Sequence, residues 1–191
     1  MSGRQAKIIT AAMLRQMLDH AATSTTPERD RVMILLSVRA GMRAIEIAGL
    51  RWTMVLDPRG RVADSVSIHD AIAKKQGGRI VPMHPELRDA LAALARRSDP
   101  AGPVIASLRG GHMLPNSIVN WFVGLYAALG FEGCSSHSGR RTFITTAAKN
   151  LHRAGCSLRD VQMLAGHRSL ETTERYIDCD TMGQRRLVDL L

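Results

Sequence analysis

Residues 26–43 read TPERDRVMILLSVRAGMR, and this stretch decides the fold. Thr26 can cap a helix, and Pro27 suits the first helical position because its missing N–H is not needed there. Val32 to Leu36 are apolar in every direction around a helix axis, a pattern typical of a helix surrounded by protein. Gly41 then ends the pattern. We therefore predict a buried central helix over this stretch, with the other elements packed around it.

Helical periodicity continues on both sides of the central helix, and one region has the period of strands. Apolar stripes and caps predict further helices over residues 11–21, 44–49, 85–97, 115–129, 139–154, 158–165 and 170–177. Short strands are predicted over residues 65–69, 72–76 and 79–82, with Gly77-Gly78 as a hairpin turn. The predicted fold class is α+β, mostly α-helical, with a small three-stranded antiparallel sheet.

The length and the charge narrow the function. A chain of 191 residues fits one compact domain. Its formal net charge is +9, and 22 of its 26 basic residues are arginine. Because the planar guanidinium group binds phosphate oxygens two at a time, this preference for arginine indicates a polyanion, most simply nucleic acid.

Several classes of protein are excluded by composition. A hydrophobic content of 45% is too high for a disordered basic tail, and no apolar run approaches the roughly 18 residues of a membrane span. The first ten residues, MSGRQAKIIT, lack the apolar stretch of a secretory signal. The three cysteines form no Cys-x-x-Cys pair, so neither a disulfide framework nor a thiolate zinc site is indicated. We expect an intracellular protein.

Two segments pair a histidine with a residue suited to phosphate chemistry. The segment SSHSGRRTF places His137 and Arg140 three residues apart at a predicted helix start, where amide protons and the helix dipole also favour an anion. The segment LAGHRSLETTERYI places His167 in a glycine-marked turn and Tyr176 nine residues later, in a polar setting. Each signal alone also fits a helix cap, a surface charge or an interfacial aromatic.

Three further basic residues have ambiguous roles. Arg43 follows the central helix, and Glu46 lies on the same face three residues later, so a surface ion pair of little net value is one interpretation. Lys74 and Lys75 precede the predicted hairpin turn. Since strand side chains alternate, only one of these lysines can face a given ligand.

The candidate residues follow a fixed order along the chain: Arg43, a hairpin lysine, His137, Arg140, His167 and Tyr176. This order resembles the tyrosine recombinase family, the lambda-integrase-like site-specific DNA recombinases. The matching segments are GMRAIEIAGL, KKQGGRIVPM, HSGRRTFITTAA and LRDVQMLAGHRSLETTERYI. The resemblance covers roughly residues 9–178, and four segments in register are far less frequent by chance than any one of them.

The resemblance implies a catalytic domain that cleaves and rejoins DNA through a covalent 3′-phosphotyrosine intermediate. Arg43 and Arg140 would stabilise the non-bridging phosphate oxygens, and Tyr176 would attack phosphorus to leave a free 5′-hydroxyl. His137 would assist proton transfer from the tyrosine, and His167 would hydrogen-bond the phosphate. Because the covalent bond stores the energy of the phosphodiester, neither ATP, a metal nor another cofactor is expected.

The family also implies a lysine that protonates the leaving 5′-oxygen. In relatives the hairpin lysine stands five residues before the arginine of an Arg-x-Val-Pro strand. That arginine is Arg79 here, so the resemblance favours Lys74 over Lys75.

The domain organisation departs from that of most relatives, which carry an additional N-terminal helical domain. Here the catalytic pattern starts near residue 9. We expect a single catalytic domain over residues 1–191, with a core over about 9–178, a C-terminal tail over 179–191 and no N-terminal core-binding domain. A minimal recombinase and a catalytic-domain fragment both fit, and both predict salt-sensitive DNA binding.

The expected partner is double-stranded DNA, and no membrane is involved. We expect a monomer in solution and a tetramer on paired DNA sites, in the cytoplasm and associated with the nucleoid through DNA. The C-terminal tail packs either on its own domain or on a neighbouring protomer. Two alternative functions stay open: type IB topoisomerase-like DNA relaxation, and a DNA-binding regulator derived from a recombinase without productive cleavage.

Overall fold

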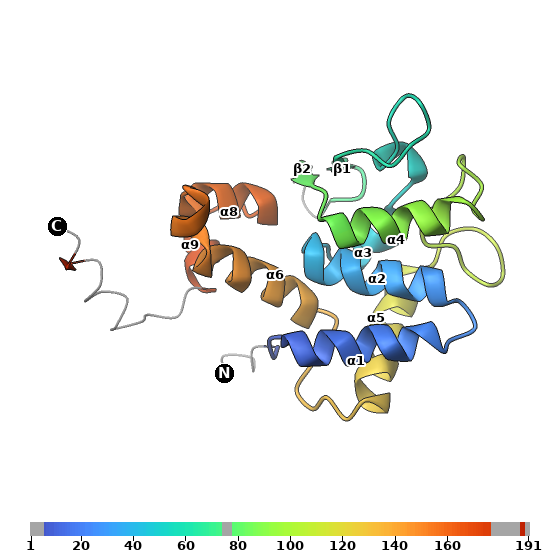
Figure 1. Ribbon diagram of the computed structural model, residues 1–191, viewed down its shortest axis with the longest axis horizontal. Coiled ribbons are helices and arrows are strands. Elements are labelled where there is room, and N and C mark those ends of the chain that lie inside the picture. The colour runs from blue at the N-terminus through green and yellow to red at the C-terminus, as the bar shows by residue number, and fades with distance from the viewer. Residues whose placement is uncertain (1–5, 74–77, 177–187, 190–191) are drawn as a thin grey trace.

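The computed structural model of the chain describes residues 6–73, 78–176 and 188–189. Helices dominate this part of the chain, as Figure 1 shows, and two short strands lie at one edge. In chain order the elements are α1 (Ala11–Ala22), α2 (Pro27–Arg39), α3 (Ala44–Gly49), a 3-10 turn (Trp52–Met54), β1 (Ser65–Ile68), β2 (Arg79–Pro82), α4 (Pro85–Ala95), α5 (Pro115–Ala128), α6 (Ser138–Lys149), α7 (Leu151–Ala154), α8 (Leu158–Ala165) and α9 (Leu170–Glu174).

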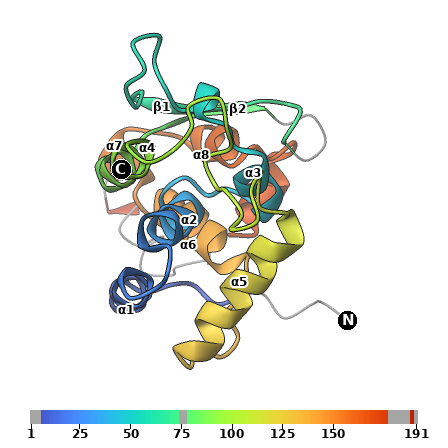
Figure 2. The same ribbon diagram turned by 90° about the vertical axis from the view of Figure 1, so that its right-hand side faces the viewer.

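Helix α2 is the centre of the fold, as its sequence predicts. It packs against α1, α4 and α6, and it lies between α1 and α4 in both views (Figures 1 and 2). The side chains from Val32 to Leu36 are completely buried. Burying each large aliphatic side chain stabilises the fold by roughly 1.5–3 kcal/mol, so this single helix anchors the main core.

The turn after α2 places Arg43 and is built around Gly41. Gly41 has φ +60°, a left-handed conformation that side chains disfavour, and the aromatic ring of Phe143 on α6 lies directly over its Cα. Two residues later Arg43 caps α3. The position of Arg43 therefore depends on a contact between the central helix and α6.

We expect Gly41→Ala to destabilise the protein by about 2–4 kcal/mol. A Cβ at this position would lie 2.4 Å from a Phe143 ring carbon and would hold the backbone in a strained region. Urea unfolding measures the change. The control is Gly124→Ala in α5, where a Cβ meets nothing within 4 Å and a helical alanine should be neutral or stabilising. Equal effects of the two substitutions would contradict this account.

The predicted sheet of three strands is wrong within the described residues, where the sheet has two. Strands β1 and β2 pair antiparallel with Ile68 opposite Arg79. In the segment predicted as a middle strand, the amides of Ile72 and Ala73 donate to the carbonyl of His69, which makes a turn. The reason is packing: the Ile72 side chain lies against Gly49, where a Cβ would have no room.

The remainder of that predicted strand and the first glycine of the predicted hairpin turn lie in residues 74–77, outside the described residues. On the far side of them, the Gly78 amide donates to the Asp70 carboxylate at 2.8 Å. This hydrogen bond links the turn after β1 to the residue before β2.

The last helices form a smaller unit at one end of the molecule (Figure 1). The single helix predicted over 139–154 is divided at Asn150, whose side-chain amide donates to the Thr146 carbonyl, so that α6 and α7 are separate. The predicted final helix is also shorter and ends at Glu174. A second cluster of buried apolar residues joins α6 to α8, and Tyr176 packs at its border.

The predicted fold class is confirmed apart from the strand number: the protein is mostly helical with a small antiparallel sheet. Within the described part of the chain, every helix is too short or too polar to cross a bilayer.

Candidate active site

A pocket of about 410 Å³ opens where α3, α6, the turn after α8 and the end of α9 meet. Five of the six candidate residues from the sequence line it: Arg43, His137, Arg140, His167 and Tyr176. They are separated by up to 133 positions along the chain and come from four different segments. Arg141, Arg175, Thr172 and Ala6 complete the lining.

The sixth candidate is the hairpin lysine. Lys74 and Lys75 both lie outside the described residues, so the choice between them stays a prediction. The residue that follows that segment by two positions, Arg79, is described and belongs to the site.

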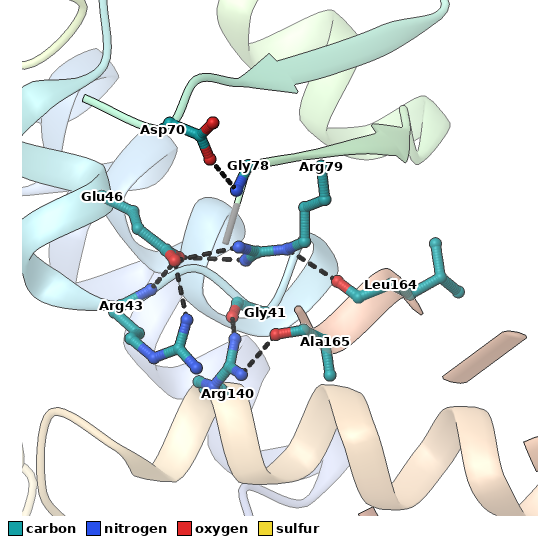
Figure 3. Close-up of polar contacts among 9 residues, drawn as sticks. All are labelled: Gly41, Arg43, Glu46, Asp70, Gly78, Arg79, Arg140, Leu164 and Ala165. Carbon is teal, nitrogen blue, oxygen red and sulfur yellow. Dashed lines mark hydrogen bonds and ion pairs between the residues drawn. The ribbon is translucent and has the colours of Figure 1, made fainter. Parts of the chain in front are cut away.

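Arg140 is almost completely buried at the floor of the pocket. Its guanidinium donates to two backbone carbonyls, that of Gly41 at 2.6 Å and that of Ala165 at 2.5 Å (Figure 3). Burial, followed by the positive charges of Arg43 and Arg79, lowers the pKa of Arg140 to about 9. At neutral pH the group is therefore charged, and a nearby anion would stabilise it.

Glu46 connects two more arginines, Arg43 and Arg79. The ion pair of little net value that the sequence allowed for Arg43 and Glu46 is therefore part of a larger buried network. Its carboxylate is fully buried and accepts hydrogen bonds from the Arg43 backbone and guanidinium, each at 2.8 Å. Arg79 donates to both Glu46 oxygens, at 2.9 and 3.0 Å (Figure 3). Burial alone would raise the pKa of Glu46, but Arg79 and then Arg43 outweigh it and lower that pKa to about 2.

The pH dependence of stability should carry the signature of Glu46. Because its pKa falls from 4.5 to about 2 on folding, Glu46 contributes about 3 kcal/mol above pH 4.5, and this contribution disappears as the pH falls toward 2. In urea unfolding, Glu46→Gln should be less stable than the parent at pH 7, and the gap should close between pH 4.5 and 2. A gap that does not vary with pH would contradict this assignment.

Glu46 and Arg79 also belong to the site, and neither was predicted from the sequence. Two signals were present: Glu46 stands three residues after Arg43, and Arg79 begins a strand whose next buried position is Val81. Neither signal indicates burial. Only the packing of β2 against α8 buries the Arg79 guanidinium and brings it to Glu46.

The C-terminal end of α8 supplies one hydrogen-bond acceptor to each of the two buried arginines, Arg79 and Arg140. Arg79 donates to the Leu164 carbonyl at 2.8 Å, and Arg140 donates to the next carbonyl, that of Ala165. Helix ends leave such carbonyls without partners, and their partial negative charge favours cations. Among the described residues, Arg43 and Arg79 share one carboxylate while Arg140 donates to backbone carbonyls, which leaves a site with a positive excess.

His167 enters the pocket from the turn that ends α8. Gly166 has φ +61°, which lets the chain reverse, and the His167 amide donates back to the Gln162 carbonyl. The His167 Nδ1 atom lies 3.0 Å from the Thr173 hydroxyl, and its ring stacks on that of Tyr176 with centroids 5.6 Å apart. Burial, and then Arg140, Arg43 and Arg79, lower the pKa of His167 to about 4, so it is neutral at pH 7.

Tyr176 stands just beyond α9 and is half-buried at the pocket wall. Its amide donates to the Thr173 carbonyl at 3.0 Å, and its carbonyl accepts from the Thr145 hydroxyl at 3.4 Å. The other tyrosine of the chain, Tyr126, is buried in the main core, and burial raises its pKa well above the usual value. Only Tyr176 offers its ring to the pocket.

His137 is the N-cap residue of α6 and is exposed at the mouth of the pocket. The twelve-residue helix behind it directs the positive end of its dipole into the same space, which favours a bound anion. Within the described ranges, no three histidine, cysteine or acidic side chains gather where they could hold a metal ion.

Solved structures share this architecture. The chain superposes over its whole length on residues 82–397 of the integrase of the Tn1549 transposon in complex with a circular intermediate DNA, with a TM-score of 0.78 and 18% identity, and covers 67% of that solved chain. At this identity the likeness shows the fold alone.

Curated relatives share more sequence. Tyrosine recombinase XerC of Rhodospirillum centenum is 33% identical over 157 residues, which make up 80% of this chain and 43% of the relative. XerC of Methylobacterium nodulans is 30% identical over 182 residues, covering 91% of this chain and 53% of the relative. The chain thus spans about half the length of the curated relatives it matches. Because the model of the phage integrase family matches residues 7–182, nearly the whole chain, the protein belongs to the phage integrase family.

Proposed function

We propose that this chain cleaves and rejoins double-stranded DNA through a covalent 3′-phosphotyrosine bond, as a site-specific recombinase. One observation carries the proposal: a tyrosine and two imidazoles line a pocket together with Arg43, whose carboxylate partner also binds Arg79, and with Arg140, which donates to backbone carbonyls. A nucleophile beside an excess of fixed positive charge suits attack on a phosphodiester. The names of its relatives, tyrosine recombinases and an integrase bound to DNA, support the same substrate.

The arginines supply electrostatic stabilisation. Arg43 and Arg140 line the pocket and would bind the non-bridging oxygens, whose charge increases as phosphorus becomes pentacoordinate. Arg140 is held by two carbonyls rather than by a carboxylate, so no competing anion has to be displaced from it. Arg79 stays bound to Glu46 and positions Arg43 through that carboxylate.

Cleavage and rejoining follow one balanced path. The Tyr176 oxygen attacks phosphorus, its proton passes toward His137, and the bond from phosphorus to the 5′-oxygen breaks. The leaving oxygen takes a proton, for which Lys74 is the proposed donor on the strength of its sequence position. Neutral His167 donates a hydrogen bond to the phosphate. Rejoining reverses each step with a 5′-hydroxyl, and the energy of the phosphodiester is kept in the phosphotyrosine bond.

The proposal includes an assembly. We propose a monomer in solution that forms a tetramer on two paired DNA sites, because exchange of strands between duplexes requires four coordinated cleavages. Sedimentation of the chain alone and with its DNA site measures both states.

Trapping the covalent intermediate tests the function. The substrates are DNA duplexes of randomised sequence, each with a nick close to the position of cleavage. After cleavage the short 5′-hydroxyl fragment diffuses away and rejoining is prevented, so the covalent adduct accumulates and survives denaturation. We expect adduct whose phosphotyrosyl peptide contains Tyr176. An absence of adduct across the library, or attachment to Tyr126, would overturn the proposal. Relaxation of supercoiled plasmids without any preferred sequence would instead favour a topoisomerase.

A further inference from the structure

Thr173 lies behind the pocket and contacts two of its residues. Its side chain is completely buried, and its hydroxyl lies 3.0 Å from the Nδ1 atom of His167. Its backbone carbonyl accepts the Tyr176 amide at 3.0 Å. One residue of α9 thus links the imidazole to the tyrosine, although it does not line the pocket itself.

A neutral imidazole has one nitrogen that donates and one that accepts, and the partner of one nitrogen decides the state of the other. In His167 the Nδ1 atom is occupied by Thr173, which leaves Nε2 as the nitrogen available to a bound group. Because the guanidinium groups of Arg140 and Arg43 line the same pocket, the group that binds there is expected to be an anion. Only an Nε2–H can donate to an anion, whereas a bare Nε2 lone pair would repel it.

We propose that the Thr173 hydroxyl donates to Nδ1 and thereby fixes His167 as the Nε2–H tautomer, ready to donate to a phosphate oxygen. Thr173 is then a positioning residue of the site. The tautomer is a property of the free protein, and only its use toward phosphate rests on the proposed function.

The backbone of His167 is held without Thr173. Its amide donates to the Gln162 carbonyl at 3.1 Å, and its carbonyl accepts from the buried Gln162 side chain at 2.9 Å. Stacking on Tyr176 restrains the ring as well. Removing the Thr173 hydroxyl should therefore change which ring nitrogen carries the proton more than it changes the position of the ring.

Nitrogen NMR of the DNA-free protein tests the tautomer directly. With ¹⁵N-histidine labelling at neutral pH, we expect the His167 proton on Nε2 in the parent chain and in Thr173→Ser, which keeps the hydroxyl. Thr173→Val, which has the same shape without it, should shift His167 toward a mixture of tautomers. A proton on Nδ1 in the parent, or identical spectra for Thr173→Val and the parent, would overturn the proposal. Thr173→Ala repeats the comparison if the valine variant does not fold.

Cleavage of nicked DNA provides the second readout. Thr173→Val should lower the single-turnover cleavage rate on the order of tenfold and leave DNA affinity unchanged. Effects of this size are typical when a functional histidine loses the hydrogen-bond partner that orients it. Thr173→Ser should restore the rate. The exposed Thr146→Val on α6 is the matched control and should cleave like the parent.

The two measurements separate the inference from the function. A parent chain that shows the Nε2–H tautomer but forms no adduct on any substrate would sink the recombinase proposal and leave the tautomer established. A parent chain that cleaves normally while Thr173→Val cleaves at the same rate would show that the threonine has no positioning role.

Discussion

Tyr176→Phe is expected to abolish the covalent DNA adduct, a loss of at least about 10⁴-fold in cleavage, while the protein stays folded and binds DNA. The substitution removes the attacking oxygen and keeps the ring, which stacks on His167 and packs at the border of the cluster between α6 and α8. Denaturing gels with nicked substrates measure the adduct, and a gel-shift measures binding.

Tyr126→Phe is the matched control for this prediction. The Tyr126 hydroxyl is buried with no hydrogen-bond partner among the described residues, so its removal should leave stability unchanged or raise it by up to about 1 kcal/mol. Cleavage should proceed at the parent rate. Adduct formation by Tyr176→Phe at the parent rate would exclude Tyr176 as the nucleophile.

Arg140→Met is expected to lower cleavage by about 10³-fold or more without unfolding the protein. Loss of a guanidinium that stabilises phosphoryl charge has effects of this size. Stability should change little because two effects oppose each other. The variant leaves the carbonyls of Gly41 and Ala165 without a donor, but it also relieves the burial of a cation whose pKa folding lowers to about 9.

Binding of a simple anion distinguishes a role of Arg140 in holding phosphate from a purely structural role. Sulfate or orthovanadate should raise the melting temperature of the parent by binding the pocket, and Arg140→Met should lose that increase. Arg88→Met, which removes an exposed ion pair with Asp64, should keep both the increase and the cleavage rate. If Arg140→Met unfolds the protein yet the anion has no effect on the parent, Arg140 is a structural residue.

Much of the fold could be predicted because its signals are local. The apolar run of α2, the proline that starts α5 and the glycine that ends α8 each act within one or two helical turns, and all three helices form as expected. The third strand failed for the opposite reason. Isoleucine is common in strands, but the Ile72 side chain packs into the space beside Gly49, a residue far from it in the sequence. This contact turns the chain at Ile72 toward the core.

The residues of the site divide in the same way. The proposed catalytic side chains need particular chemistry at particular local positions, so His137, Arg140, His167 and Tyr176 could be named from short segments, and the pocket gathers them. Their supports could not be named. The burial of Glu46, the reach of Arg79 to the end of α8 and the contact of Thr173 with His167 are created by packing.

The electrostatic state of the pocket is likewise a tertiary property. The net charge of +9 indicates a polyanionic partner, but the charge of a whole chain does not say which arginines lack a counter-ion. That is decided where α2, α6, α8 and β2 meet, because there two buried guanidinium groups donate to backbone carbonyls and only that of Arg79 also binds a carboxylate. Sequence thus names the groups proposed to do the chemistry, and folding sets their charge, because desolvation and hydrogen bonding exist only once distant segments are packed together.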